Sequence, residues 1–245
     1  VGSYRLSADG NSQFVFAKSA VVMIVGKDVG WTGFELRRAR MVARLQQMGI
    51  TREEVLQAMA SVPRHVFVEE ALRSRAYDDM SLPLGMGQTI SQPYTVAIMT
   101  QLLFAKRSIE SNQRILEIGT GCGYQTAILQ ALKIREIYSI ERLRPLHERA
   151  KQNLRAVRLL AQARLVCGDG YLGLPNEAPF DGIMLTAAPK EVPLALLQQL
   201  AIGGRMVLPL DEGGVQFLWV IDKTAKGFQE TCVQKALFVP LINDN

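Results

Sequence analysis

The sequence predicts an α/β fold with a mostly parallel central sheet, helices on both faces and an antiparallel edge at the C-terminus. Two observations lead to this prediction. From residue 114 onward, short apolar segments alternate with longer amphipathic ones, the pattern of strands joined by helices. Near the C-terminus, two apolar segments have no helix between them, which predicts antiparallel pairing.

The composition indicates a folded domain without a membrane span, a disulfide framework or a metal centre. The chain has 245 residues, 48% of them hydrophobic, which is enough to bury a full core. No apolar run reaches about 18 residues, so no contact with a membrane is expected. The cysteines at 122, 167 and 232 are far apart, which is typical of a reduced cytoplasm. These cysteines therefore predict a cytoplasmic protein. His65 and His147 do not have the spacing of metal ligands, so no metal is expected.

The formal net charge of +5 permits weak attraction to acidic partners. The basic residues gather between 142 and 158, where leucines and a valine interrupt them. We interpret this segment as the solvated face of a helix rather than a nucleic-acid groove. Nucleic acid is therefore not expected as a partner.

The chain divides into an N-terminal extension, residues 1–34, of unknown role and a main domain over residues 35–245. Within the main domain, residues 35–110 are expected to be helical and to carry a functional loop, and residues 111–245 form the core. A first helix is expected over 35–48, ending before Gly49. Thr51 is expected to cap a second helix, with Glu54 completing a capping box.

The segment from 77 to 94 is rich in proline, glycine and polar residues, and we expect it to be a loop between helices. Loops held on a rigid scaffold often carry chemistry. Pro93 is suited to begin the next helix. Ser91, just before it, is either a functional hydroxyl or the cap of that helix.

The core elements are expected in alternating order. Strands are predicted at 115–118, 137–140, 163–166, 182–185 and 205–210. Helices are predicted at 125–132, 143–160 and 192–200. The antiparallel edge is expected from 216–221 and 236–241.

A glycine-rich turn follows the first core strand, with Gly119, Gly121 and Gly123 in G-x-G-x-G spacing. Glycines let a ligand approach the backbone, and the free N–H groups of the next helix favour polar or anionic groups. Glu141 ends the second strand about 20 residues later, where a carboxylate can accept both hydroxyls of a ribose. No lysine follows the glycines, which excludes a P-loop. The turn therefore predicts an adenosine-bearing cofactor.

Three carboxylates stand at successive strand ends: Glu117, Glu141 and Asp169. Glu117 suits a cofactor that carries an ammonium group better than a pyrophosphate. Asp169 is placed to accept a hydrogen bond from an adenine amino group, although it is equally suited to cap a helix. Taken together, the pattern resembles the first motif of the Rossmann-like class I methyltransferases, which bind S-adenosylmethionine.

The wider chain resembles the protein-L-isoaspartate O-methyltransferase family. The most specific match is Gly87-Gln88-Thr89-Ile90-Ser91-Gln92-Pro93-Tyr94. Further matches are Val62-Pro63-Arg64, the glycine turn, Gly168-Asp169-Gly170, Thr186-Ala187-Ala188-Pro189 and Phe238-Val239-Pro240-Leu241. The resemblance covers roughly residues 38 to 242. Cys122 departs from it, because the family often has serine there.

The resemblance implies methyl transfer from S-adenosyl-L-methionine to the α-carboxyl of L-isoaspartyl residues in damaged proteins and peptides, leaving S-adenosyl-L-homocysteine. We expect a monomer. Ser91 is the implied catalytic residue, and the implied substrate loop adds Thr89, Ile90 and Gln92. The implied cofactor residues are Glu117, Gly119, Thr120, Gly121, Glu141, Asp169 and Gly170.

Two alternatives remain at this point. One is a methyltransferase of the same fold that acts on a small molecule or a nucleic acid. The other is a noncatalytic S-adenosylmethionine-binding protein, which disrupted cofactor residues would favour.

Overall fold

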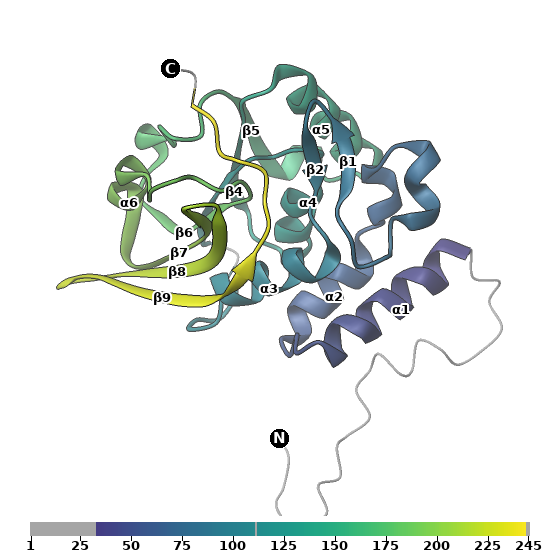
Figure 1. The fold of residues 1–245 in the computed structure, drawn as a ribbon, viewed down its shortest axis with the longest axis horizontal. Coiled ribbons are helices and arrows are strands. Elements are labelled where there is room, and N and C mark those ends of the chain that lie inside the picture. The colour runs from purple at the N-terminus through teal and green to yellow at the C-terminus, as the bar shows by residue number, and fades with distance from the viewer. Residues whose placement is uncertain (1–32, 111, 244–245) are drawn as a thin grey trace, which may run out of the picture. The chain divides into compact units, whose positions relative to one another are not determined.

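The computed structural model describes residues 33–110 and 112–243 (Figure 1). The expected extension, residues 1–34, lies outside this range except for its last two residues, which begin the first helix. The core is a seven-stranded sheet in the order β5-β4-β3-β6-β7-β8-β9. No described helix has both the length and the apolar character needed to cross a bilayer.

Five strands of this sheet are parallel, which confirms the predicted α/β fold. They are β3 (Arg114–Ile118), β4 (Glu136–Glu141), β5 (Ala163–Cys167), β6 (Phe180–Leu185) and β7 (Leu200–Glu212). The chain leaves β3 toward β4 and β5, then crosses to β6 on the other side of β3. The junction of β3 and β6 is therefore the topological switch point, where ligands of such sheets bind beyond the carboxyl ends.

Alternate residues of β3 face opposite sides of the sheet, and helices cover both. Leu116 and Ile118 belong to a core cluster that includes Leu196 of α6 (Leu194–Gln199). Glu117 faces the other side and contacts Thr126 of α4 (Tyr124–Ala131). There α4 packs against β4, α3 (Pro93–Leu103) against β6 and β7, and α5 (Arg144–Ala156) against β4 and β5. A short 3₁₀ turn, η4 (Leu160–Gln162), leads from α5 into β5, and another, η5 (Pro175–Glu177), lies between β5 and β6.

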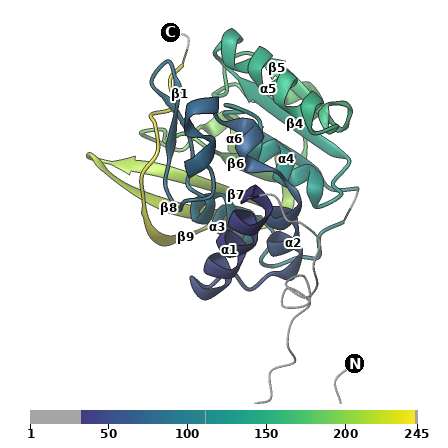
Figure 2. The same cartoon turned by 90° about the vertical axis from the view of Figure 1, so that its right-hand side faces the viewer.

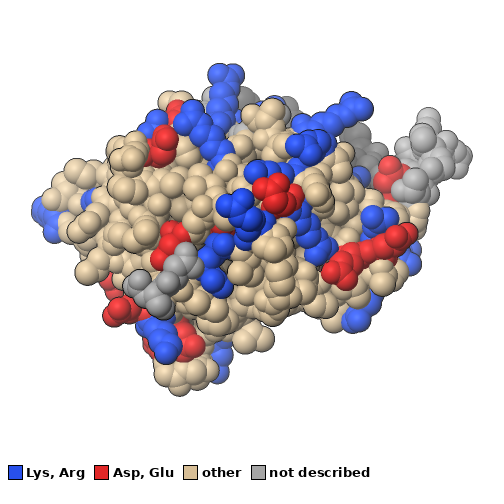
Figure 3. Space-filling view, turned by 90° about the horizontal axis from the view of Figure 1, so that it is seen from above, with Lys and Arg blue, Asp and Glu red and all other residues tan. Residues whose placement is uncertain are grey.

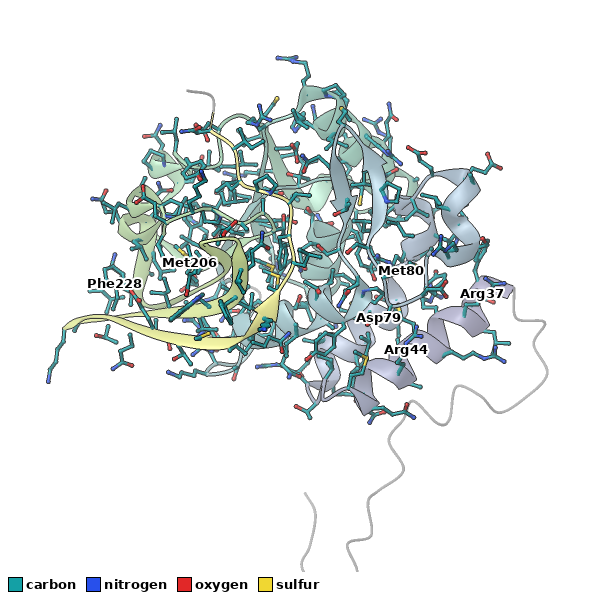
Figure 4. The ribbon with its side chains drawn as sticks, in the orientation of Figure 1. Arg37, Arg44, Asp79, Met80, Met206 and Phe228 are labelled. Carbon is teal, nitrogen blue, oxygen red and sulfur yellow. The ribbon has the colours of Figure 1, made fainter. Side chains whose placement is uncertain are left out.

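Four described helical segments lie before residue 77: α1 (Gly33–Gln47), α2 (Glu53–Ser61) and the 3₁₀ helices η2 (Arg64–Phe67) and η3 (Glu70–Arg75). Figure 2 shows α1 and α2 side by side below α3. Arg37 and Arg44 of α1 donate to the carbonyl oxygens of Ser74 and Tyr77, on the side where Figure 4 shows Asp79 and Met80. This helical region is thereby fastened to the segment that leads into the predicted loop.

The predicted capping box at Thr51 is wrong. Arg52 occupies the N-cap of α2 and makes no side-chain capping bond. Gln101 of α3 instead accepts the backbone N–H groups of Thr51 and Arg52 through Oε1, at 2.8 and 2.9 Å. A side chain from a distant helix thus satisfies two backbone donors before α2, one of which, the Thr51 N–H, the capping box would have satisfied.

The predicted loop from 77 to 94 contains a small antiparallel hairpin of β1 (Leu82–Gly85) and β2 (Gln88–Ile90). Gly85, Met86 and Gly87 all have positive φ in its turn. Arg149 of α5 donates to the Leu84 carbonyl oxygen at 3.0 Å. A hairpin this short is not stable by itself, so its sequence signal is weak and its packing decides it.

The antiparallel C-terminal edge is confirmed, but its last strand is not the predicted one. β8 (Val215–Thr224) pairs with β9 (Gly227–Ala236), and the two form a long projecting hairpin with Phe228 near its tip (Figures 1 and 4). Residues 237–241 leave the sheet edge instead. Ala188 donates to the Val239 carbonyl oxygen and accepts from Leu241 N–H, both at 2.8 Å. The predicted strand at 236–241 is thus a segment that returns to the carboxyl ends of β3 and β6.

Candidate active site

Two adjoining pockets lie at the carboxyl ends of β3, β4 and β6. The first, here the Glu141 pocket, is lined by Gln88, Gly119, Glu141, Gly170, Ala187 and Leu241. The second, the Ser91 pocket, is lined by Ser91, Gly119, Gly121, Tyr124, Gln125 and Thr186. Gly119 lines both. The glycine turn therefore joins two adjoining hollows.

The glycine turn is held over the end of β4 by its own backbone. Gly119 and Thr120 both donate N–H to the Ile140 carbonyl oxygen, at 2.8 and 3.1 Å. Gly119 has φ +94°, and a Cβ there would stand 2.4 Å from Thr186 Oγ1. Thr186 in turn donates to the Gly119 carbonyl oxygen at 2.6 Å. Only glycine suits this position, on grounds of both backbone conformation and space.

Glu141 lies at the end of β4 and is oriented by two backbone donors. Its Oε2 accepts Gly121 N–H at 2.8 Å, and its Oε1 accepts Leu143 N–H at 2.9 Å. Each carboxylate oxygen has a second lone pair. Since Glu141 lines its pocket, those lone pairs are suited to hydroxyl groups of a ligand.

Glu117 is fully buried beneath the turn rather than in a pocket wall. Thr126 donates to its Oε2 at 2.5 Å, while Oε1 is buried and has no hydrogen-bond partner among the described residues. Burial raises the pKa of Glu117 to about 7, against the opposing effect of the hydroxyls of Thr126 and Ser139. A buried carboxylate with one unmatched oxygen fits the ammonium group of an amino-acid cofactor.

The remaining predicted cofactor residues occupy different positions. Gly170 lines the Glu141 pocket, and a Cβ there would collide with Ile118. Asp169 precedes it, is half-buried, and accepts Tyr171 N–H at 2.8 Å, without being part of the lining. The Thr120 side chain is buried, and its hydroxyl is 2.6 Å from that of Ser139.

The predicted substrate loop meets the turn at the Ser91 pocket, which Thr89, Ile90 and Ser91 line. Ser91 does not cap α3, because Gln92 is the N-cap residue and Asp79 accepts the N–H of Tyr94 at 2.8 Å. Within the described residues, the Ser91 hydroxyl makes no hydrogen bond, so it is available to a ligand.

A groove adjoins the Ser91 pocket on its outer side. This Tyr94 groove is lined by Gln92, Tyr94, Thr95, Gln234, Leu237 and Phe238, and Thr95 also lines the Ser91 pocket. Leu237 is 89% exposed, so the groove has an apolar rim that is open to solvent. Gln92, predicted as a substrate-loop residue, faces this groove rather than the pocket.

Sequence reasoning gave no role to three residues that shape the site. Thr186 supports the glycine turn, Leu241 closes the Glu141 pocket, and the fully buried Arg64 donates to the Ser91 carbonyl oxygen. All three lie in the motifs that carried the family resemblance. Figure 3 shows Lys and Arg interspersed with Asp and Glu on one face, rather than gathered in a continuous basic stripe.

Comparison with known proteins identifies the family. The family model described as protein-L-isoaspartate(D-aspartate) O-methyltransferase matches residues 36–245. The chain belongs to this protein-L-isoaspartate O-methyltransferase family. A protein-L-isoaspartate O-methyltransferase of Chromobacterium violaceum is 57% identical over 209 residues, 85% of this chain and 91% of that one. One of Dechloromonas aromatica is 54% identical over 206 residues, 84% of this chain and 93% of that one.

Solved structures agree with this family assignment. A protein-L-isoaspartate O-methyltransferase superposes with a TM-score of 0.74 and 27% identity, over 83% of this chain and 65% of that longer one. A Plasmodium falciparum protein was solved in complex with S-adenosyl-L-homocysteine. It gives a TM-score of 0.76 at 22% identity, over 87% of this chain and all of that one, and shares the fold.

Proposed function

We propose that this chain transfers a methyl group from S-adenosyl-L-methionine to the α-carboxyl of L-isoaspartyl residues in damaged proteins and peptides. The observation that carries the proposal is the meeting of Ser91 and the glycine turn in one pocket, with Gly119 shared by the adjoining pocket. A donor and an acceptor bound in the two hollows would meet beside Gly119. The family assignment supports the same chemistry.

The residues around the Glu141 pocket fit the cofactor. Glu141 would accept the ribose hydroxyls, the unmatched Oε1 of Glu117 would accept the ammonium group, and the bare backbone at Gly119 and Gly170 leaves room for close approach. Asp169, beside Gly170, is proposed for the adenine amino group, and Thr120 and Gly121 for the turn itself. When bound, the sulfonium supplies an electrophilic methyl group.

The acceptor needs no general base. An α-carboxyl has a pKa of about 3.3–3.7 and is already an anion at neutral pH. Ser91 is proposed to donate a hydrogen bond that orients the carboxylate, with Thr89 and Ile90 forming the wall beside it. Because opposite charges neutralise each other as the methyl moves, alignment and exclusion of water are expected to supply much of the rate.

The Tyr94 groove is the proposed path for the peptide on either side of the isoaspartyl residue. It shares Thr95 with the Ser91 pocket, and its lining combines amide side chains with apolar ones. Such a surface suits an extended peptide of varied sequence. Gln92 would then contact the peptide rather than the reacting carboxyl.

Further parts of the proposal concern the whole chain. The family match over residues 36–245 supports assigning residues 35–245 to the methyltransferase domain, with residues 1–34 as an extension. Three free cysteines support a reducing cytoplasmic location. We propose a monomer without a nucleic-acid partner, which sedimentation and RNA-binding measurements would test.

The deciding experiment is a labelled-methyl assay on paired peptides that contain either isoaspartate or aspartate at one position, with RNA as a third substrate. We expect base-labile incorporation into the isoaspartyl peptide alone, because an ester is base-labile. Incorporation into RNA, or none into either peptide despite cofactor binding, would overturn the proposal.

A further inference from the structure

Arg64 is a fully buried cation directly behind the Ser91 pocket. Its Nε donates to the Ala76 carbonyl oxygen at 2.8 Å, and its Nη2 donates to the Ser91 carbonyl oxygen at 2.6 Å. Its Cζ stands 4.7 Å from the centre of the Tyr124 ring. Ser91 belongs to the loop, and Tyr124 begins the helix after the glycine turn. Arg64 therefore contacts both sides of the pocket at once.

The charge of this guanidinium is not neutralised within the protein. Among the described residues, no carboxylate forms an ion pair with Arg64, and its buried Nη1 has no hydrogen-bond partner. Asp79 acts on it only through a weaker, longer-range attraction, and burial lowers the pKa of Arg64. Burying an arginine without a counter-ion costs free energy. An anion that binds nearby would offset this cost.

The chemistry of the acceptor supplies that anion. Both residues that Arg64 contacts in this region, Ser91 and Tyr124, line the Ser91 pocket. A carboxylate bound there would lie against residues that the guanidinium itself contacts. In a site of low dielectric constant, attraction between two charges that are not in direct contact remains substantial.

We propose that Arg64 is a positioning residue for the methyl acceptor: it fixes the main chain of Ser91 and supplies a buried positive charge that the acceptor carboxylate balances. This inference rests on the proposed function. It assigns Arg64 two separable roles, one through its hydrogen bonds and one through its charge. Lysine would keep the charge without the forked donor geometry, and methionine would keep neither.

The test compares two peptides that differ only in the group at the reacting position. One carries isoaspartate, and the other carries the corresponding α-carboxamide, which is neutral there. Their dissociation constants are measured with S-adenosyl-L-homocysteine present, for the wild type, Arg64→Lys and Arg64→Met. The preference for carboxylate over carboxamide reports the charge, because a loss of general structure weakens both peptides alike.

We expect Arg64→Met to reduce the carboxylate preference about tenfold, the order of a charge coupling across a partly desolvated site. Arg64→Lys should keep the preference within about twofold and lower kcat about tenfold, since lysine cannot donate to the carbonyl oxygens of Ala76 and Ser91 with the same geometry. An unchanged preference in Arg64→Met would overturn the charge role. If that variant does not fold, loss of the preference in Arg64→Lys overturns the charge role, and full kcat in Arg64→Lys overturns the positioning role.

Arg52 offers a matched control. It is another largely buried arginine, its Nε lies 3.6 Å from Glu54 Oε2, and it donates to the carbonyl oxygens of Phe104 and Arg107, away from either pocket. Arg52→Met should lower stability and leave the carboxylate preference unchanged. Failure of the proposed function itself would be distinct, because the wild type would then not methylate the isoaspartyl peptide at all.

Discussion

The carboxylate of Glu141 accepts the backbone N–H of Gly121 at 2.8 Å. Glu141, at the end of β4, therefore holds the glycine turn that follows the neighbouring strand β3. The pairing of β3 with β4 in parallel register brings these two positions together. One residue thus serves both the shape of the turn and the wall of the pocket. Substitutions at Glu141 are expected to affect cofactor binding before they affect the fold.

Glu141→Gln should weaken binding of S-adenosyl-L-homocysteine by about 10- to 100-fold, because hydrogen bonds to a charged group contribute about 1.5–3 kcal/mol. Isothermal titration calorimetry would measure it. Glu136→Gln is the control, since Glu136 starts the same strand and pairs with Arg114 away from the pocket. An unchanged dissociation constant in Glu141→Gln would remove Glu141 from the cofactor site.

Ser91→Ala should lower kcat by about 10- to 100-fold and leave the cofactor dissociation constant within about twofold, because one hydrogen bond to the acceptor carboxylate is lost. Steady-state kinetics and calorimetry separate the two quantities. Ser61→Ala is a suitable control, as its hydroxyl donates to the Ala58 carbonyl oxygen and Ser61 lines neither pocket. Equal losses in both quantities would contradict the assigned role.

Glu117→Gln should change the pH dependence of stability. The folded pKa of about 7 exceeds the ordinary value of 4.5, so the folded protein holds a proton that the unfolded chain releases. The stabilisation from neutral Glu117 is complete below about pH 4.5 and is lost as pH rises to about 7. Above about pH 7, Glu117 makes no further change to the free energy of unfolding. The amide variant should lack this decline.

Urea unfolding of the cofactor-free protein at pH 5 and pH 8 measures this effect as the difference between wild type and Glu117→Gln. The variant should also bind cofactor more weakly at pH 8, where the ionised carboxylate would hold the ammonium group. The same pH change in both proteins would show that Glu117 does not titrate in this window.

Asp222→Asn should destabilise the protein by about 2 kcal/mol at pH 7. The guanidinium of the nearly buried Arg205 holds the pKa of Asp222 at about 2, through hydrogen bonds of 2.7 and 2.8 Å. A lowered folded pKa adds stability above about pH 4 that is lost as pH falls toward 2. Thermal unfolding should therefore show a difference that shrinks over that window, whereas the exposed Glu230→Gln should show none.

Cys122→Ser should retain cofactor affinity within about threefold, since a small side chain serves at this position in either form. Burial raises the pKa of the Cys122 thiol to about 11, so the thiol stays neutral and unreactive at neutral pH. Cys167 and Cys232 are exposed. Brief iodoacetamide treatment followed by mass spectrometry should label those two and spare Cys122, and early labelling of Cys122 would contradict its burial.

The sequence by itself determined the alternation of strands and helices from β3 to β7, the class of fold and the position of the glycine turn. These follow from short-range patterns, such as apolar periodicity and glycine spacing, which depend on neighbouring residues alone. The separation of about 20 residues between Gly119 and Glu141 was sufficient to predict that both would meet at one sheet edge. The family resemblance pointed to the loop that ends at Ser91.

Only the tertiary structure decided which distant groups complete the site. Arg64 became a partner of Ser91, and Leu241 became part of the Glu141 pocket, through contacts between segments far apart in the chain. Gln101 replaced the expected cap at Thr51 for the same reason. Packing selects such partners by shape and by the need to satisfy buried donors and charges, and neither is visible in the local pattern of residues.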